Sequence, residues 1–521
     1  MNPIESFETD WTALVIFILL FGVVTVLGFA AARWKRGDLD LLDEWGLGGR
    51  RFGTVITWFL LGGDLFTAYT FIAVPALVFA VGAGGFFALP YTIIVFPLVF
   101  LVMPRLWAVA SKHRYVTAAD FVKGRYGSMP LATAVTFTGL LATMPYIALQ
   151  LVGIEFVLKG LGVSGEWPLI VAFAILAAFT YTSGLRAPAM IALVKDTLIY
   201  LTVIVAVIYI PSKVGGFDNI FASAAEALPE RDTPGALIPG TPDAQVAYAS
   251  LALGSAMALF LYPHAITAVL SSRSQDVVRR NMSLLPAWTF LLGLMALFGY
   301  MAIAAGISVA EPNLTVPALF RDMFPSWFFG VACAAIAIGA LVPAAVMSIA
   351  AANLFTRNVW KQFVNPNVTD RQESQIAKIV SLVVKAGALG FVLFLPTKFS
   401  IDLQLLGGVW MLQTLPTVVI GLYTHWFHRW GLLAGWAVGM TVGTWIAVSQ
   451  DYVPVWDTPI VGATMYTGVV ALFVNLVVAA SMSLVFGQRW RGDAVDETEP
   501  EDYDELHETR EPAPTVSAGV A

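Results

Sequence analysis

Five ionisable side chains lie within long apolar stretches of the sequence, where a charge is costly to keep. They are Asp64, Lys195, Asp196, His264 and Lys385. Ionisable residues inside membrane segments are rare, face the interior of a helix bundle, and mark the routes of ions or substrates. The sequence offers no nucleotide-binding loop, metal-ligand cluster or nucleophile and base pair beside them, which counts against an enzyme. These groups therefore indicate the binding or movement of charge.

Asp64 follows Gly62 and Gly63 in the stretch LLGGDLFTAY. Glycine weakens a helix, so the sequence predicts a helix that is interrupted within the membrane at these two glycines. Interrupted helices expose backbone carbonyls, and oxygen ligands suit a hard cation. We predict that Asp64 and these carbonyls lie beside a bound cation; the alternative is a carboxylate that only caps the broken helix.

Asp196 directly follows Lys195, and successive side chains on a helix point about 100° apart. We therefore expect the two not to pair. Lys195 is close enough to Arg186 to extend toward the membrane surface, which leaves Asp196 as the residue on an ion path. Lys385 lies near the middle of its apolar stretch, too deep to reach the surface. It is either a counter-charge for an anionic solute or a lysine bonded to backbone carbonyls.

The elements that position these groups are membrane-spanning helices. Of the 521 residues, 58% are hydrophobic and 12% are charged, which is too apolar for a soluble protein. A spanning helix needs roughly 20 apolar residues, and about thirteen such stretches are present. They are residues 11–32, 54–82, 84–104, 129–158, 168–186, 187–210, 246–271, 283–306, 327–355, 376–397, 401–424, 430–448 and 461–487.

Lysine and arginine residues set the expected orientation, because they are retained in short cytoplasmic loops. Most of the 29 basic residues fall on one side if the N-terminus is outside the cell. An odd number of spans then places the C-terminus in the cytoplasm. We therefore expect a multi-pass protein of the cell membrane with its N-terminus outside.

Two of the predicted spans are interrupted in corresponding places. The second span contains Gly62 and Gly63, and the seventh contains Gly254 and Pro263. Paired Gly/Pro interruptions at this separation are typical of transporters built from two inverted five-helix repeats, whose site lies at the breaks. His264, next to Pro263, either relays protons or bonds a freed carbonyl.

The predicted organisation divides the chain into six segments. They are an N-terminal segment with the first helix and a cytoplasmic loop (1–53), a first repeat (54–210), an extracellular loop (211–245), a second repeat (246–424), two additional helices (425–487) and an acidic cytoplasmic tail (488–521). The extracellular loop contains FDNIFASAAEAL, which predicts a short surface helix in either a lid or a passive connector. The basic loop before residue 129 predicts a short helix that begins at Thr117. The tail is acidic and proline-rich, so we expect it to be disordered.

Four groups of motifs, in this order, resemble the sodium:solute symporters, which include carriers of proline, sugars, pantothenate, sialate and monocarboxylates. The motifs are GGRRFG followed by LLGGDLF, then TYTSGLRAPAMIALVKDTL, FLYPHAITAVLSSRS and PAAVMSIAAANLFTRNVW. The resemblance extends over nearly the whole chain up to the tail. It implies an all-α membrane fold in which spans 2–6 and 7–11 form the inverted repeats, with extra helices at both ends.

The resemblance also implies a sodium site between the second and ninth spans. Its ligands would be the carbonyls of Gly62, Leu65 and Ala345 and the hydroxyl of Ser348. Ile349 stands where the family usually has a second hydroxyl, and an apolar side chain cannot replace an oxygen ligand. Two outcomes stay open: Asp64 or a water completes the sodium site, or protonation of a carboxylate replaces sodium. Asp196 matches the family's acidic residue on the sixth span and serves either scheme.

Three segments look like the bacterial monocarboxylate branch of the family: YPHAITAVLSS, VVKAGALGFVLF and WMLQTLP. We therefore predict a secondary active transporter, not an enzyme, that couples entry of sodium or a proton to uptake of pyruvate, lactate, acetate or propionate. The predicted substrate-binding residues are Thr67, Tyr262, Gln413 and Lys385. Its partners are the anionic solute, the monovalent cation and the lipid bilayer, with no cofactor and no nucleic acid. The alternatives are a sodium-coupled carrier of an amino acid such as alanine or proline, and an uncoupled facilitator.

Overall fold

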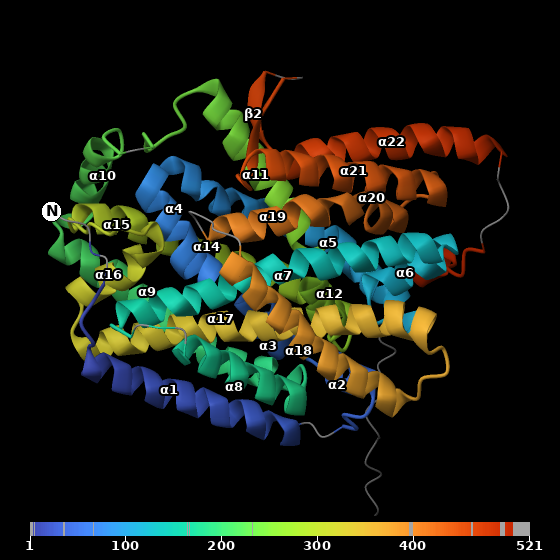
Figure 1. Ribbon diagram of the computed structural model, residues 1–521, viewed down its shortest axis with the longest axis horizontal. Coiled ribbons are helices and arrows are strands. Elements are labelled where there is room, and N and C mark those ends of the chain that lie inside the picture. Colours follow the sequence, from blue (N-terminus) through green and yellow to red (C-terminus); the bar gives the residue numbers. More distant parts are fainter. Residues whose placement is uncertain are drawn as a thin grey trace, which may run out of the picture.

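The computed structural model is a bundle of long helices with one small β-hairpin (Figure 1). The structure describes residues 4, 6–34, 37–65, 67–163, 165, 167–231, 233–394, 400–459, 462–489 and 495–503. Among these residues, ten helices are long and apolar enough to cross a membrane, and there are eleven if one bent pair is counted as a single span. The structure is therefore mostly helical with ten or eleven candidate spans, as the fold prediction has it in outline, while the count of thirteen and the inverted repeats remain predictions.

The long elements follow the apolar stretches of the sequence. They are α1 (Trp11–Ala30), α5 (Ala88–His113), α7 (Met129–Gly160), α9 (Arg186–Lys213), α17 (Ser326–Phe355), α18 (Asp370–Phe394), α19 (Ile401–Met411), which continues into α20 (Leu415–Val418), α21 (Arg429–Ser449) and α22 (Thr467–Arg489). One further apolar stretch is divided into α13 (Gln275–Leu284), α14 (Pro286–Ala296) and α15 (Phe298–Ala304). The bent pair is α11 (Pro242–Leu259) and α12 (Pro263–Leu270). Two predicted spans correspond to shorter apolar helices, α8 (Trp167–Ser183) and the pair α3 (Thr54–Leu65) and α4 (Val74–Val81).

Helix α17 is the centre of the bundle and is buried along almost its whole length. Figure 1 shows it with α1 and α8 on one side and α7 and α9 on the other. All four helices and α18 contact it. Its sequence is rich in alanine, and small side chains let neighbouring backbones approach closely within a membrane. Helix α17 also contacts α3.

Short helices in the segments that connect the long helices lie at both ends of the bundle (Figure 1). One end holds α10 (Gly216–Ala227) and α16 (Thr315–Met323), and the other holds α2 (Leu42–Leu47) and α6 (Ala118–Tyr126). Helix α10 is the predicted surface helix, and it packs on α9 and α15. Helix α6 begins, as predicted, after the N-cap Thr117, whose hydroxyl accepts a bond from the Asp120 amide.

The first interruption lies later in the chain than predicted. Helix α3 continues through Gly62 and Gly63 to Leu65, and helical backbone resumes in η3 (Tyr69–Ala73). The glycines serve close packing instead. A Cβ on Gly62 would overlap the Trp288 indole, and a Cβ on Gly63 would lie 2.7 Å from Lys195 Nζ.

The second interruption is where the sequence predicts it. Helices α11 and α12 meet at 46°, and Pro263 is the first residue of α12. Proline has no amide hydrogen to donate and tolerates only the first turn of a helix. The break therefore follows directly from one residue.

Two predictions at the C-terminal end need correction. The span predicted at 461–487 is present but begins later, at Thr467, because Ala463–Tyr466 forms strand β2, paired antiparallel with β1 (Val455–Thr458). Within the predicted disordered tail, residues 495–503 pack on α5 and α6 and include the short helix η9 (Pro500–Tyr503). The rest of the tail lies outside the described residues.

Candidate functional site

Side-chain oxygens stabilise the break that follows α3. The amide of Thr67 donates to Thr70 Oγ1 (3.2 Å), that of Ala68 to Gln150 Oε1 (3.2 Å), and that of Tyr69 to Thr67 Oγ1 (2.9 Å). In a continuous helix these amides would bond to carbonyls four residues earlier. The last turn of α3 therefore presents carbonyl oxygens that are available to another partner.

Lys195 and Asp196 meet this last turn from α9. Lys195 Nζ donates to the Gly63 carbonyl and lies 3.1 Å from Asp196 Oδ1, and both side chains are fully buried. The expectations that these two residues do not pair and that Lys195 reaches the surface were wrong, because the long lysine side chain curves back over its neighbour. The structure places Asp196 beside the α3 break, as a role on an ion path requires. The side chains of Asp64 and Leu65 lie outside the described residues.

The predicted ligands on α17 lie in one buried turn. Ala345, Ser348 and Ile349 are each fully buried, and Ser348 Oγ donates to the Ala345 carbonyl at 2.8 Å. A hydroxyl that donates its hydrogen keeps its oxygen lone pairs, so Ser348 still offers an oxygen ligand to a cation. Ser348 could therefore supply an oxygen ligand from α17, whereas Ile349 has no oxygen to offer, and a cation site between α3 and α17 stays a prediction.

Aromatic residues surround the second break. Tyr262, the residue before α12, donates its hydroxyl to the Gln404 carbonyl on α19 at 3.1 Å. Its ring lies 5.2 Å from the ring of Tyr146 and 5.3 Å from that of His264. Gly407 lets α19 approach, because a Cβ there would overlap the Tyr262 hydroxyl. These contacts hold Tyr262 at the second break, between α7 and α19.

Helix α7 connects the two breaks. Gln150 accepts the Ala68 amide at the first break, and its amide donates to the carbonyl of Tyr146 at 3.4 Å, one turn away. Tyr146 in turn packs on Tyr262 at the second break. Gln150 and Tyr146 were not predicted from the sequence, because neither is charged and neither lies in a family-like motif. A fully buried glutamine in an apolar span was the available signal for Gln150.

The four predicted substrate residues lie on four different segments of the bundle. Thr67 lies at the first break and Tyr262 at the second. Gln413 faces away from both, because its amide donates to the Val409 carbonyl at 2.9 Å and its Oε1 accepts from Asn475 on α22 at 3.2 Å. Lys385 is fully buried on α18, which packs on α7 and α17. Its Nζ has no hydrogen-bond partner among the residues that the structure describes.

Three of the family-like motifs converge at α2. Glu44 accepts bonds from Arg51 and Arg186. The Gly46 carbonyl accepts from Asn353 at 3.3 Å, and the amide of Leu185 donates to the Trp45 carbonyl at 2.9 Å. The motifs near residues 50, 185 and 353 therefore fix one end of α3, α9 and α17 relative to each other, which positions the first break.

Comparisons with known proteins agree on one family. A model of the sodium:solute symporter family matches residues 45–439. A monocarboxylate transport permease protein of Rhizobium johnstonii is 58% identical over 475 residues, which cover 91% of this chain and 96% of the relative. The uncharacterized symporter YodF of Bacillus subtilis is 33% identical over 446 residues, covering 84% and 88% of the two chains.

A solved structure shares the fold. The substrate-bound, outward-open structure of a Na⁺-coupled sialic acid symporter matches with a TM-score of 0.73 and 14% identity. The match covers 92% of this chain and 98% of that one. At this identity the likeness concerns the arrangement of the helices alone.

Proposed function

Because the chain belongs to the sodium:solute symporter family, we propose that it takes up small monocarboxylates such as pyruvate, lactate, acetate or propionate together with sodium. Membership in this transporter family supports cation-coupled symport by a multi-pass membrane protein. The name of the 58% identical relative supports a monocarboxylate as the solute. The cell membrane, with the N-terminus outside, is the proposed location.

The proposal of an anionic substrate rests on one observation, the burial of the Lys385 amino group. It is 0% exposed and has no hydrogen-bond partner among the described residues. An uncompensated buried charge costs several kcal/mol, and a paired one far less. A carboxylate solute supplies the missing negative charge. Thr67 and Tyr262 at the breaks, with the amides of the half-helices, are proposed to orient it.

The coupling cation is proposed to bind between α3 and α17. Its proposed ligands are the carbonyls of Gly62, Leu65 and Ala345 and the hydroxyl of Ser348, with Asp64 and Asp196 as further candidate carboxylates. Freed carbonyls at helix breaks are the usual sodium ligands in transporters with broken helices. A cation shifts the conformational equilibrium only through its different affinity for the two states. The proposed repeats, 54–210 and 246–424, move relative to each other during this cycle.

Uptake into proteoliposomes tests the proposal. Radiolabelled pyruvate and alanine are offered separately under an imposed sodium gradient or an imposed proton gradient. We expect sodium to drive pyruvate above its outside concentration and to have little effect on alanine. Equilibration without accumulation would indicate a facilitator, preference for alanine an amino acid carrier, and accumulation with protons alone a different coupling ion.

Ile349→Thr is expected to lower the sodium concentration for half-maximal uptake about tenfold. The new hydroxyl restores an oxygen on the turn that holds Ser348, and tenfold corresponds to about 1.4 kcal/mol of binding free energy. The measurement is pyruvate uptake against sodium concentration. Ile338→Thr, at another fully buried site on α17, is the matched control. An unchanged sodium response in Ile349→Thr would contradict the proposed position of the cation.

A further inference from the structure

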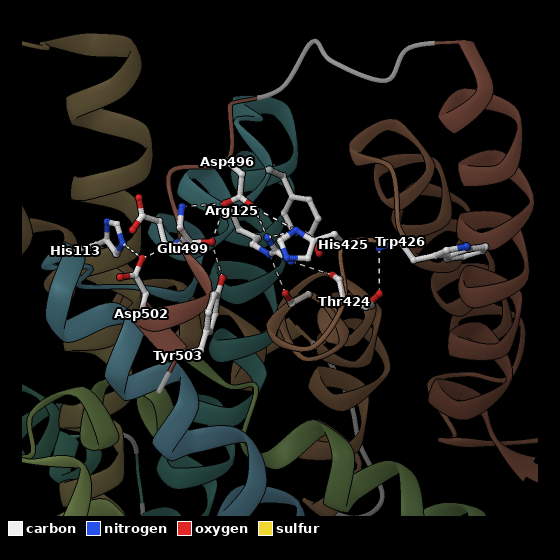
Figure 2. A network of polar contacts seen from close by, with 12 residues as sticks. His113, Arg125, Thr424, His425, Trp426, Asp496, Glu499, Asp502 and Tyr503 are labelled. Atoms are coloured by element: carbon white, nitrogen blue, oxygen red, sulfur yellow. Dashed lines mark hydrogen bonds and ion pairs between the residues drawn. The ribbon is translucent and has the colours of Figure 1, made fainter. Parts of the chain in front are cut away.

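A basic surface lies at the end of the bundle that carries α6. It is formed by Arg105, Lys112 and His113 on α5, Arg125 on α6 and His425 in the loop before α21. Residues 495–503, which we call the clasp, lie across this surface (Figure 2). Their path is fixed by the Glu497 amide, which donates to the Gly124 carbonyl at 2.9 Å. The occupant of the surface is therefore a segment of the same chain.

The first contact of the clasp neutralises a buried arginine. Arg125, whose side chain is 3% exposed, donates to the carboxylate of Asp496, and His425 Nδ1 lies 3.4 Å from the same carboxylate (Figure 2). The guanidinium also donates to the carbonyls of Gly421 (2.9 Å) and Thr424 (3.1 Å). Arg125 thus joins α6, the clasp and the loop before α21.

The second contact engages the end of α5. Asp502 lies 2.7 Å from His113 Nε2 and 3.3 Å from Lys112 Nζ, and it accepts the Glu499 amide at 2.8 Å. Burial raises the pKa of Asp502, but these hydrogen bonds outweigh burial and hold the pKa below its ordinary value. The carboxylate therefore stays charged at cytoplasmic pH, and its contribution is lost only when the pH falls through that lowered pKa.

The third contact is an aromatic anchor. Tyr503 is 6% exposed and packs edge-on against Phe121, with the Arg105 guanidinium 4.8 Å from its ring. Its hydroxyl lies 2.7 Å from Thr498 Oγ1 within the clasp. A buried tyrosine beside an arginine is a typical centre of a specific interface. The ion pairs of Asp502 with Lys112 and His113 are partly exposed and individually weak, so the clasp is specific and also releasable.

We propose that the clasp is a built-in regulatory ligand that slows transport while it is docked. It joins α5 and α6 to the loop before α21, to which Arg105 and Arg125 also bond through the carbonyls of Leu422 and Gly421. These segments belong to different parts of the bundle, and alternating access requires such parts to move relative to each other. The docked clasp stabilises one arrangement, and its release lowers the barrier to leaving that arrangement.

Release of the clasp tests the proposal in the full-length protein in proteoliposomes. The variant Asp496→Asn/Asp502→Asn/Tyr503→Ala is expected to raise the initial rate of solute uptake about threefold or more at an equal amount of folded protein. The matched control is Glu505→Gln/Glu508→Gln/Leu506→Ala, which removes the same charge from the residues that follow, and it is expected to transport at the parent rate. An unchanged or lower rate in the clasp variant would overturn the proposal.

A covalent lock tests the opposite direction. His113→Cys/Asp502→Cys is bridged by a short thiol reagent that can be cleaved by a reductant; the single native cysteine, Cys333, is buried. Cross-linking is expected to slow uptake at least fivefold, and reduction to restore it, whereas the single variants do not respond. Full activity of the cross-linked protein would overturn the proposal.

Docking is also measured without transport. Thr498 is 7% exposed, so Thr498→Cys is expected to react slowly with a maleimide reagent and at least tenfold faster after Asp496→Asn/Asp502→Asn or in high salt, which screens ion pairs. Fast reaction in the parent background would show that the clasp is not docked. If Thr498→Cys is protected but pyruvate is not transported, the proposed substrate fails and the clasp stands.

Discussion

Lys385→Met is expected to reduce pyruvate uptake at low substrate concentration about 100-fold or more. Removing the charged partner of a buried carboxylate costs about 2–5 kcal/mol, and about 2.7 kcal/mol corresponds to 100-fold. The increase is expected in the substrate concentration for half-maximal uptake, while the sodium response is retained. The readout is uptake as a function of pyruvate concentration at saturating sodium.

Charge specificity separates this role from a scaffold role. A neutral amide analogue of pyruvate, used as a competitor, is expected to lose little affinity in Lys385→Met, and Lys385→Arg is expected to retain part of the uptake. Lys378→Met, on the same helix but only half-buried, is the matched control. Equal losses for the charged and neutral compounds would show that Lys385 only stabilises α18.

Single changes in the buried pair Lys195 and Asp196 are expected to reduce the amount of folded protein. Breaking a buried ion pair by removing one partner costs about 3–5 kcal/mol, whereas replacing both partners by neutral residues of similar size is often tolerated. Asp196→Asn and Lys195→Met are therefore expected to lower the yield and thermal stability of the purified protein. The double variant is expected to recover most of the stability.

The double variant Lys195→Met/Asp196→Asn then reports the function of the pair. If Asp196 lies on the cation path, as proposed, sodium-dependent uptake stays at least 50-fold below the parent even though the protein folds. The measurements are thermal stability in detergent and uptake per folded molecule in proteoliposomes. A stable double variant with a normal sodium response would remove Asp196 from the cation path.

The break at Pro263 was predictable because its cause is local: proline lacks the amide hydrogen that a continuous helix needs. The break after Leu65 was predictable only in outline. Its position depends on Gln150, which accepts the Ala68 amide from another helix, and a single sequence does not show which distant acceptor an amide will find. Gly62 and Gly63 lie close to the break but do not cause it. They are needed because Trp288 and Lys195 approach the helix closely there.

The clasp also depends for its docking on distant partners that a single sequence does not show. Its acidic, proline-rich composition predicts disorder because it buries little apolar surface. The structure instead docks residues 495–503 through Tyr503 and through Arg125, which is far away in the sequence. Average composition does not register one aromatic anchor or a buried guanidinium whose counter-charge, among the described residues, is Asp496 of the clasp. The depth of Lys385, in contrast, was readable from its place in an apolar stretch.

Because Gln150 and Tyr146 on α7 connect the two breaks, binding at one break is coupled to binding at the other. Gln150 holds the break at which the cation is proposed to bind, and Tyr146, one turn away, packs on Tyr262 at the other break. Any solute-dependent shift of Tyr262 then changes the energy of the backbone at Ala68, and the reverse holds equally. Linkage requires the two effects to be the same size. If the proposed symport of pyruvate with sodium holds, saturating pyruvate must tighten sodium binding by the same factor by which saturating sodium tightens pyruvate binding.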